Sequence, residues 1–235
     1  MIIFRKQYYI KGRLNLNLKK FITATQLFYD LKSINWSLAH GYITFSLNSI
    51  NVTINTTDTV GVTLQSWIKN YFITNNIYFR ENSNSQEFPD FYLGDSNDSN
   101  LLEIKAFNFC NTPAFDIANF DSYCESVLEK PYILDADYLI FGYNMDINGK
   151  ITIIDIWLKK IWEIAGNSEK YPLKVQEKRG VIYNIRPNTD FKKYKSSPFS
   201  SKIDFITAIY DTISIYKGKD VAKEWYDKLS SHLQF

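Results

Sequence analysis

The chain has 235 residues with a net charge of +2; 45% of them are hydrophobic and 22% charged, which is typical of one soluble globular domain and excludes a collagen-like or low-complexity chain. No apolar run reaches the ~20 residues of a membrane span, no signal peptide is recognised, and two cysteines are too few for a disulfide framework, so we expect a cytoplasmic protein. The only histidines, His40 and His232, argue against zinc fingers and Ser-His-Asp triads. If the protein is an enzyme, its chemistry would therefore rest on carboxylates, lysines and a hard metal ion.

The first half of the chain contains both helical and extended patterns. Apolar residues at helical spacing predict a helix within residues 21–38 and a second one that begins near Asp58 or Thr59 and ends at Asn75-Asn76. Between them, alternating apolar residues predict a β-hairpin over 43–54 with its turn at Asn48-Ser49. Further strands are expected at residues 77–79, 90–93 and 101–107, the last two joined by a polar turn over 94–100.

The second half of the chain continues the alternation of helices and strands. Helices are expected at residues 116–129, 203–216 and 221–229, and strands at 138–141 and 151–156, with one or two more within 175–186. The strand at 151–156 is expected to lead into an amphipathic segment over 157–164. This order predicts an α/β protein with a central mixed β-sheet flanked by helices.

The residues with the clearest chemistry lie on two neighbouring predicted strands. Side chains alternate along a strand, so Glu103 and Lys105 point to one face while Leu102 and Ile104 point to the other. Asp90 opens the preceding strand. If the two strands pair through the polar turn, Asp90 approaches Glu103.

Two convergent carboxylates form a site for Mg²⁺ that leaves positions open for water and a phosphate oxygen. The adjacent lysine can orient an attacking water and offset negative charge that develops during the reaction. A lone Glu-x-Lys or a lone Pro-Asp has no catalytic role in most proteins. The prediction therefore depends on their conjunction with a short polar turn between them.

The conjunction of Pro89-Asp90 with Glu103-Ile104-Lys105 resembles the motif of the PD-(D/E)XK nuclease superfamily. Longer segments are similar to type II restriction endonucleases of the NgoBV/NlaIV kind; these segments are residues 85–93, 102–105, 115–121, 134–142 and 183–187. The resemblance implies a restriction-endonuclease-like core and Mg²⁺-dependent cleavage of double-stranded DNA at a short palindromic site, with GGNNCC as the expected sequence.

The resemblance also implies roles for individual residues. Asp90, Glu103 and Lys105 would be catalytic, and Asp90, Glu103 and the carbonyl of Ile104 would hold the metal ion. Many superfamily members place a further acid on the first core helix, where this chain offers Gln65 and no carboxylate. Glu81 or Glu87 would have to supply it. A palindrome is read most simply by a two-fold dimer, so we expect a homodimer, paired in the cell with a cognate DNA methyltransferase.

A basic segment follows the expected catalytic core. Residues 170–202 contain nine Lys or Arg and two acids, whereas the remaining residues are acidic on balance. This is the pattern of a surface that binds a polyanion, although a solvated lysine-rich loop would look alike. The residues expected to contact DNA fall into those suited to reading bases, Lys178, Arg179, Asn184, Arg186 and Asn188, and those suited to phosphates, Lys192, Lys193 and Lys195. The two arginines could instead form salt bridges.

We therefore expect one nuclease domain over residues 1–235, with a core at about 58–165, a DNA-contacting segment at about 170–202 and C-terminal helices over 203–235. Three other functions remain compatible with the sequence. The protein could be a repair or recombination nuclease that reads DNA structure, or a non-catalytic DNA-binding protein that retains the fold. It could also be an α/β interaction domain in which Glu-x-Lys occurs by chance.

Overall fold

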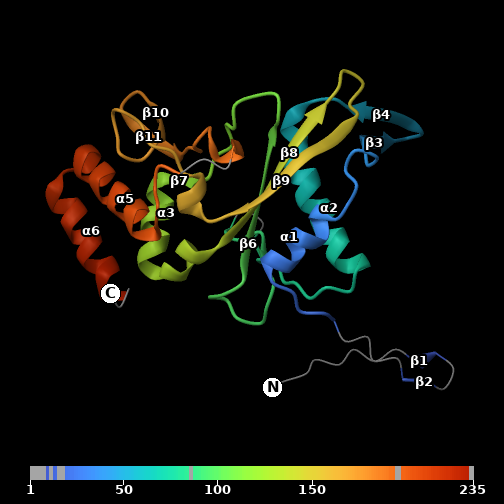
Figure 1. The fold of residues 1–235 in the computed structure, drawn as a ribbon, viewed down its shortest axis with the longest axis horizontal. Coiled ribbons are helices and arrows are strands. Elements are labelled where there is room, and N and C mark those ends of the chain that lie inside the picture. Colours follow the sequence, from blue (N-terminus) through green and yellow to red (C-terminus); the bar gives the residue numbers. More distant parts are fainter. Residues whose placement is uncertain (1–8, 11–12, 15–18, 85–86, 194–196, 233–235) are drawn as a thin grey trace.

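A four-stranded mixed sheet runs through the middle of the molecule in the computed structural model, which describes residues 9–10, 13–14, 19–84, 87–193 and 197–232 (Figure 1). Its strands are β5 (Phe91–Tyr92), β6 (Leu101–Asn108), β8 (Asp137–Met145) and β9 (Ile151–Lys159), in that order across the sheet. β6 and β8 are parallel, whereas β5 pairs with β6 and β9 with β8 in the antiparallel sense. The predicted α/β architecture with a central mixed sheet is confirmed.

One face of this sheet packs against α1 (Ala24–Lys32) and α2 (Val60–Thr74), as Figure 1 shows. Leu102 and Ile104 of β6 point into the core on this side, together with buried residues of both helices. The alternation of apolar side chains along β6 therefore fixes which of its faces meets the two N-terminal helices.

The opposite face contributes to a second core that it shares with α3 (Phe120–Glu129), α5 (Lys202–Lys217) and α6 (Lys219–His232). Leu101 and Phe107 of β6 belong to this second core. The helices predicted at 203–216 and 221–229 are confirmed by α5 and α6. Among the described residues, no helix is both long and apolar enough to cross a bilayer.

A smaller three-stranded sheet lies on the α3 side of the molecule. It consists of β10 (Val175–Lys178), β11 (Val181–Ile185) and β7 (Ala118–Asn119), all antiparallel. The remaining short elements are β1 (Tyr9–Ile10), β2 (Arg13–Leu14), η1 (Thr57–Thr59), η2 (Pro131–Asp135), α4 (Ile161–Ile164) and η3 (Phe191–Lys193).

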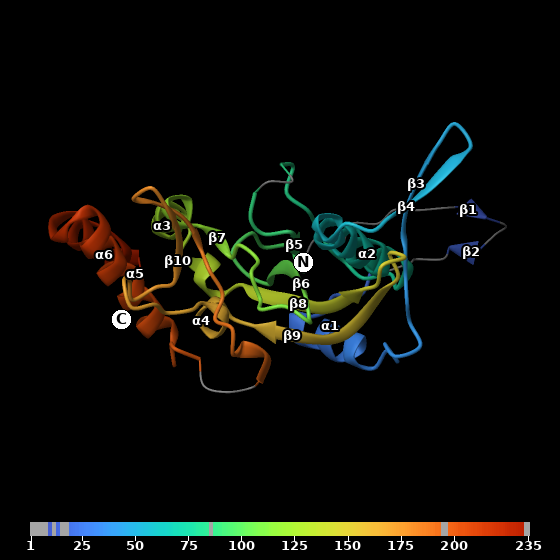
Figure 2. The ribbon, with the colours of Figure 1, turned by 90° about the horizontal axis from the view of Figure 1, so that it is seen from above.

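The hairpin predicted over 43–54 is confirmed as β3 (Ile43–Leu47) and β4 (Ile50–Ile54). Its turn residues have positive φ angles, 46° at Asn48 and 67° at Ser49, which is the two-residue turn that matches the natural twist of a hairpin. Figures 1 and 2 both show this hairpin projecting from the end of the molecule that lies opposite α5 and α6.

The helix predicted at 116–129 begins later than expected, at Phe120. Ala118 and Asn119 are instead paired with Ile185 and Asn184 of β11, so their backbone is extended up to the helix. The Asn119 side chain then caps the helix by accepting a hydrogen bond from the Ser122 N–H.

Residues 157–159, the start of the amphipathic segment, continue β9 and pair with β8, and one helical turn follows at α4. One other predicted element is wrong. Residues 77–79 do not form a strand, since Ile77 makes only an isolated bridge to Lys20. The helix expected within 21–38 is shorter than its apolar pattern and ends at Lys32.

Candidate active site

The antiparallel pairing of β5 with β6 brings Asp90 beside Glu103. Phe91 pairs with Leu102, so the residue before Phe91 lies opposite the residue after Leu102. The backbone N–H of Asp90 donates to Oε2 of Glu103 at 3.2 Å. The short polar turn thus produces the approach that the sequence predicts.

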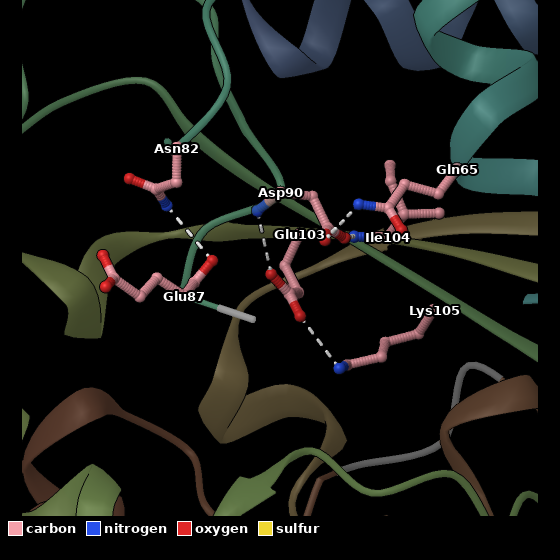
Figure 3. A network of polar contacts seen from close by, with 7 residues as sticks. All are labelled: Gln65, Asn82, Glu87, Asp90, Glu103, Ile104 and Lys105. Carbon is pink, nitrogen blue, oxygen red and sulfur yellow. Dashed lines mark hydrogen bonds and ion pairs between the residues drawn. The ribbon is translucent and has the colours of Figure 1, made fainter. Parts of the chain in front are cut away.

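Figure 3 shows that further donors surround these two carboxylates. Asp90 Oδ2 accepts from the Ile104 N–H at 2.7 Å, and Asp90 Oδ1 accepts from the Gln65 side chain of α2, also at 2.7 Å. Nζ of Lys105 lies 2.9 Å from Oε1 of Glu103. Asp90, Glu103 and Lys105 therefore belong to one polar network.

Asn82 supports the chain segment that leads into Asp90. Its side-chain amide donates to the carbonyl oxygens of Glu87 and Pro89, at 3.1 and 2.9 Å. The Tyr92 hydroxyl donates to Asn82 Oδ1 at 3.0 Å and so orients the amide. These hydrogen bonds connect residues 87–89 to Tyr92 of β5, the strand that follows them.

The environment of Asp90 disfavours its charge. Burial raises the pKa of its carboxyl group from 3.8 to about 7, and the negative charge of Glu103 contributes to the rise. The Ile104 N–H and the Lys105 ammonium act in the opposite direction. Glu103 itself is only 9% exposed. Two largely buried acids facing each other would be stabilised by a cation placed between them.

A cleft of about 530 Å³ opens at the two carboxylates. Glu87, Asp90 and Glu103 line it together with residues from β7, α3 and the segment after α3. The polar ones among these are Asn119, Ser122, Tyr123, Ser126 and Lys130. The buried hydroxyl of Tyr123 has no hydrogen-bond partner within the described part of the protein. The acidic pair thus faces a largely polar surface.

Comparison with known proteins identifies the family. The model of the NgoBV restriction endonuclease family matches residues 21–234. This chain belongs to that family. It is 40% identical over 196 residues to the type II restriction enzyme NlaIV of Neisseria lactamica, which covers 82% of this chain and 81% of the relative. It is 36% identical over 160 residues to the type II restriction enzyme NgoBV of Neisseria gonorrhoeae, covering 67% and 91%.

The fold gives the same result. A solved structure of the NlaIV restriction endonuclease matches with a TM-score of 0.82 at 36% sequence identity, and the match covers 90% of this chain and 88% of the other. The resemblance to restriction endonucleases of the NgoBV/NlaIV kind is therefore confirmed, and so is the restriction-endonuclease-like fold.

The acidic pair of this endonuclease fits a hard divalent cation. Each of the four oxygens of Asp90 and Glu103 already accepts one hydrogen bond, and each has a second lone pair left for a metal ion. The N–H and C=O of a residue in a strand point to the same edge. Because the Ile104 N–H faces Asp90, its carbonyl oxygen lies on the same edge of β6.

The structure offers less for a second metal ion. Gln65 occupies the position on α2 where a further acid would be expected, and Glu81 pairs with Lys69 at 2.7 Å. Glu87 lines the cleft with the acidic pair. No group of three or more His, Cys, Asp or Glu side chains that could hold a metal occurs in the described part of the chain.

The basic segment of the endonuclease contains exposed residues as well as residues that contact other parts of the protein. Lys178 and Arg179 are exposed at the tip of the β10–β11 hairpin, where Arg179 and Gly180 form a second two-residue turn with φ angles of 53° and 79°. β11 also pairs with β7, which lines the cleft. The tip therefore belongs to the same small sheet as one part of the cleft.

Other predicted DNA-contacting residues have partners within the protein. Asn184 donates to Gln176 at 3.2 Å, and Arg186 forms an ion pair with Asp116. The Asn188 side chain accepts from the Asp190 N–H at 3.0 Å.

Lys192 lies over the aromatic ring of Phe109, with Nζ 5.0 Å from the ring centroid. It also donates to the Phe109 and Asn111 carbonyl oxygens, at 3.5 and 3.4 Å. Lys193 ends η3, but its side chain is not described, and Lys195 lies outside the described residues.

Several residues of the site carry no clear signal in the sequence. Asn82 looks like an ordinary loop residue, and Gln65 reaches Asp90 only through the packing of α2. Ser122, Ser126 and Lys130 recur at four-residue intervals, which places them along one side of α3 and just beyond its end. That spacing could have indicated a polar surface facing the active-site strand.

Proposed function

We propose that this restriction endonuclease hydrolyses both strands of duplex DNA at a short palindromic site, GGNNCC, in a reaction that depends on Mg²⁺. The observation that carries the proposal is the convergence of Asp90 and Glu103 beside Lys105 in a cleft. Membership of a restriction endonuclease family supports DNA as the substrate. The recognition sequence follows the resemblance to the NgoBV/NlaIV kind.

Asp90, Glu103 and the carbonyl oxygen of Ile104 would hold the metal ion. When bound there, Mg²⁺ supplies a Lewis acid next to the scissile phosphate and an attacking water of lowered pKa. Gln65 and the Ile104 N–H keep Asp90 turned toward Glu103. A single oxygen-rich position agrees with the preference of Mg²⁺ for one or two carboxylates in addition to substrate oxygens.

Lys105 would act on the water and on the phosphate. Its ammonium is held 2.9 Å from Glu103 and can donate to the attacking water while it offsets negative charge on the phosphate. Attack in line with the leaving group would expel the 3′ oxygen and leave a 5′ phosphate.

The tip of the β10–β11 hairpin is the part of the basic segment best suited to DNA. Lys178 and Arg179 are both exposed there, and Arg can donate two hydrogen bonds to guanine in the major groove. Of the inner residues, Asn184 and Arg186 would need to exchange their present partners to contact a base. Lys192, Lys193 and Lys195 remain proposed phosphate contacts.

Two partners follow from this function. A palindrome presents the same half-site twice, so a homodimer can bind it with two-fold symmetry. A cell that contains this nuclease also needs a cognate DNA methyltransferase to protect the same sites in its own DNA. We place both proteins in the cytoplasm.

Digestion of a sequenced plasmid with Mg²⁺, followed by mapping of the fragment ends, tests the proposal. We expect every double-strand break to fall at GGNNCC with 5′ phosphates, and no cleavage with a chelator. Glu103→Ala should abolish cutting, whereas Glu129→Ala, an exposed acid on α3, should cut as the parent does.

Other outcomes would overturn the proposal in different ways. Cleavage at branched or damaged DNA regardless of sequence would indicate a repair nuclease. Binding without any cleavage in Mg²⁺ would indicate a DNA-binding protein that is not an enzyme.

A further inference from the structure

The β3–β4 hairpin has one wholly apolar face. Its register pairs Ile43 with Ile54, Phe45 with Val52 and Leu47 with Ile50, so these six side chains share one side of the ribbon. The other side carries threonine, serine and asparagine. Alternation of this kind normally marks a surface that is buried on one side.

In the chain as it stands, this face is exposed to solvent. Leu47 and Ile50 at the tip are 66% and 67% exposed, and Phe45 and Val52 are 55% and 46% exposed. β3 and β4 form a sheet of only two strands. An isolated two-stranded hairpin is at best marginally stable in water, so a partner that covers the apolar face would stabilise it.

The hairpin also lacks charge. Residues 41–57 contain no lysine, arginine, aspartate or glutamate. Exposed strand edges in soluble proteins usually carry such residues, which prevent association. DNA does not fit this surface chemically, because its phosphates are bound through cationic side chains and residues 41–57 contain no lysine or arginine.

An apolar pocket adjoins the base of the hairpin. It has a volume of about 260 Å³ and is lined by aromatic residues including Trp36, Tyr42 and Trp67. Ile43 belongs both to this pocket and to the apolar face, so the two form one continuous surface. The chain therefore carries a projecting apolar arm and an apolar recess beside it.

This surface is separate from the acidic pair. Glu103 pairs with Tyr138, near the start of β8. The base of the hairpin instead contacts the turn that follows Met145 at the other end of β8, where Asn55 donates to the Ile147 carbonyl oxygen. At about 3.3 Å per residue, Tyr138 and the end of β8 at Met145 lie roughly 23 Å apart. A partner can therefore bind the hairpin without covering the cleft.

We propose that the apolar face of the β3–β4 hairpin and the pocket at its base form the contact between two copies of this chain. A two-fold interface uses the same patch on both subunits, so it must be complementary to itself. An uncharged apolar face next to an apolar recess meets that condition, since neither copy brings a charge that the other would bury unpaired. The inference rests on the homodimer of the proposed function and adds where its subunits meet.

Sedimentation of the full chain without DNA or metal tests this proposal. The parent should sediment at twice the 27.6 kDa mass of one chain. Leu47→Lys and Ile50→Lys should each sediment as monomers at the same concentration. Each substitution would bury two unpaired lysines in the dimer, one from each subunit. Ile215→Lys is the control, since Ile215 is similarly exposed, at 58%, but lies on α5. Circular dichroism checks that all variants remain folded.

Hydrogen exchange gives a second measurement that does not depend on a variant. Amides of residues 43–54 should become less protected as the parent protein is diluted to monomers. A monomeric parent, or tip variants that remain dimers, would overturn the interface whether or not the enzyme cuts DNA. Protection of the hairpin that does not change with concentration would indicate cover from within the same chain. Loss of DNA affinity by the tip variants without a change in mass would assign the face to DNA.

Discussion

At the scale of single residues, the folded environment of Asp90 opposes the charge that its proposed catalytic role requires. Its folded environment raises the pKa of its carboxyl group to about 7, so the metal-free protein retains a proton there that the unfolded chain has already lost. Charging this group at higher pH costs folding free energy. The same charge is what a bound cation requires.

The pH dependence of stability follows from this shift. A group whose pKa is higher in the folded state stabilises the protein below the unfolded value, and this contribution is lost as the pH rises through the folded value. In the presence of a chelator, Asp90 should therefore make the protein less stable as the pH rises from about 4 to above 7. Mg²⁺ should restore more stability at high pH than at low pH.

Asp90→Asn should remove this dependence. An asparagine can accept from the Ile104 N–H and donate to a flipped Gln65 amide, so the local contacts are kept. We expect the variant to be inactive and, above pH 7, to melt at a higher temperature than the metal-free parent. Thermal melting across the pH range measures this, with Asp220→Asn, an exposed position on α6, as the control. Parallel melting profiles for parent and variant would contradict the assignment.

Gln65 is expected to act on the metal site through Asp90. Gln65→Ala removes the donor to Asp90 Oδ1 and should raise the Mg²⁺ concentration needed for cleavage by about 10–100-fold, as is typical when a residue that supports a metal ligand is lost. Saturating Mg²⁺ should recover most of the rate. Ser66→Ala on the same helix is the control, because its hydroxyl bonds only to the backbone of Val62 among the described contacts. An unchanged Mg²⁺ requirement would refute the role.

Local periodicity explains which residues of the site could be foreseen. Asp90, Glu103 and Lys105 follow from strand alternation and one short turn, so the sequence predicts their proximity. The contact from Gln65 comes from an element 25 positions away and depends on how α2 packs. Sequence pattern places Gln65 on a helix but does not say which side chain it meets.

At the scale of elements, the β10–β11 hairpin combines an exposed tip with local strain. Arg179 has a φ of 53°, in the left-handed region that costs a non-glycine residue about 1 kcal/mol. Arg179→Gly should therefore raise the free energy of unfolding by up to about 1 kcal/mol. It should also weaken binding to the cognate duplex by about 1–3 kcal/mol if Arg179 reads a guanine.

These opposite effects can be measured with denaturant unfolding and with duplex binding in Ca²⁺. Asn76→Gly, just beyond the end of α2, is the control, because it relaxes another non-glycine residue with a positive φ, 54°. It should leave DNA binding unchanged. Equal loss of affinity for cognate and scrambled duplexes in Arg179→Gly would mean that Arg179 contacts phosphate and reads no base.

Element boundaries were harder to foresee than the elements themselves. The apolar spacing that suggests a helix at 116–129 does not reveal that Ala118 and Asn119 pair with β11. The apolar residues at 157–164 fit a helix, but pairing with β8 keeps 157–159 extended. In both cases a hydrogen-bonded partner distant in the sequence overrides the local pattern.

At the scale of the whole molecule, one sheet separates two hydrophobic cores. Leu139 and Ile140 are neighbours on β8, both fully buried, yet they point into opposite cores. Because β6, β8 and β9 contribute to both cores, we expect the described body of the protein to unfold as one unit. Leu139→Ala and Ile140→Ala should each cost about 2–5 kcal/mol and lower the same single transition. Separate transitions for the two variants in denaturant would contradict this.

The pairing order of the strands and the exposure of the basic residues both depend on the fold of the whole molecule. The sequence predicts a mixed sheet, but the parallel pairing of β6 with β8 is seen only in the fold. The basic segment looks like one polyanion-binding surface. In the fold, Arg186 and Lys192 turn toward the protein, and Lys178 and Arg179 remain exposed. Counting charges in the sequence does not distinguish basic residues that contact the protein from those that remain exposed.

The parallel pairing of β6 with β8 has a consequence for the protein while it is being synthesised. Asp90, Glu103 and Lys105 leave the ribosome early, but β6 is a central strand and one of its neighbours is not complete until Met145 has emerged. Contacts between distant parts of a chain also form slowly. The growing polypeptide therefore contains these acidic residues for some time before the fold that brings them together can form. Newly made chains would be able to cleave unmodified DNA only after most of their length has been translated.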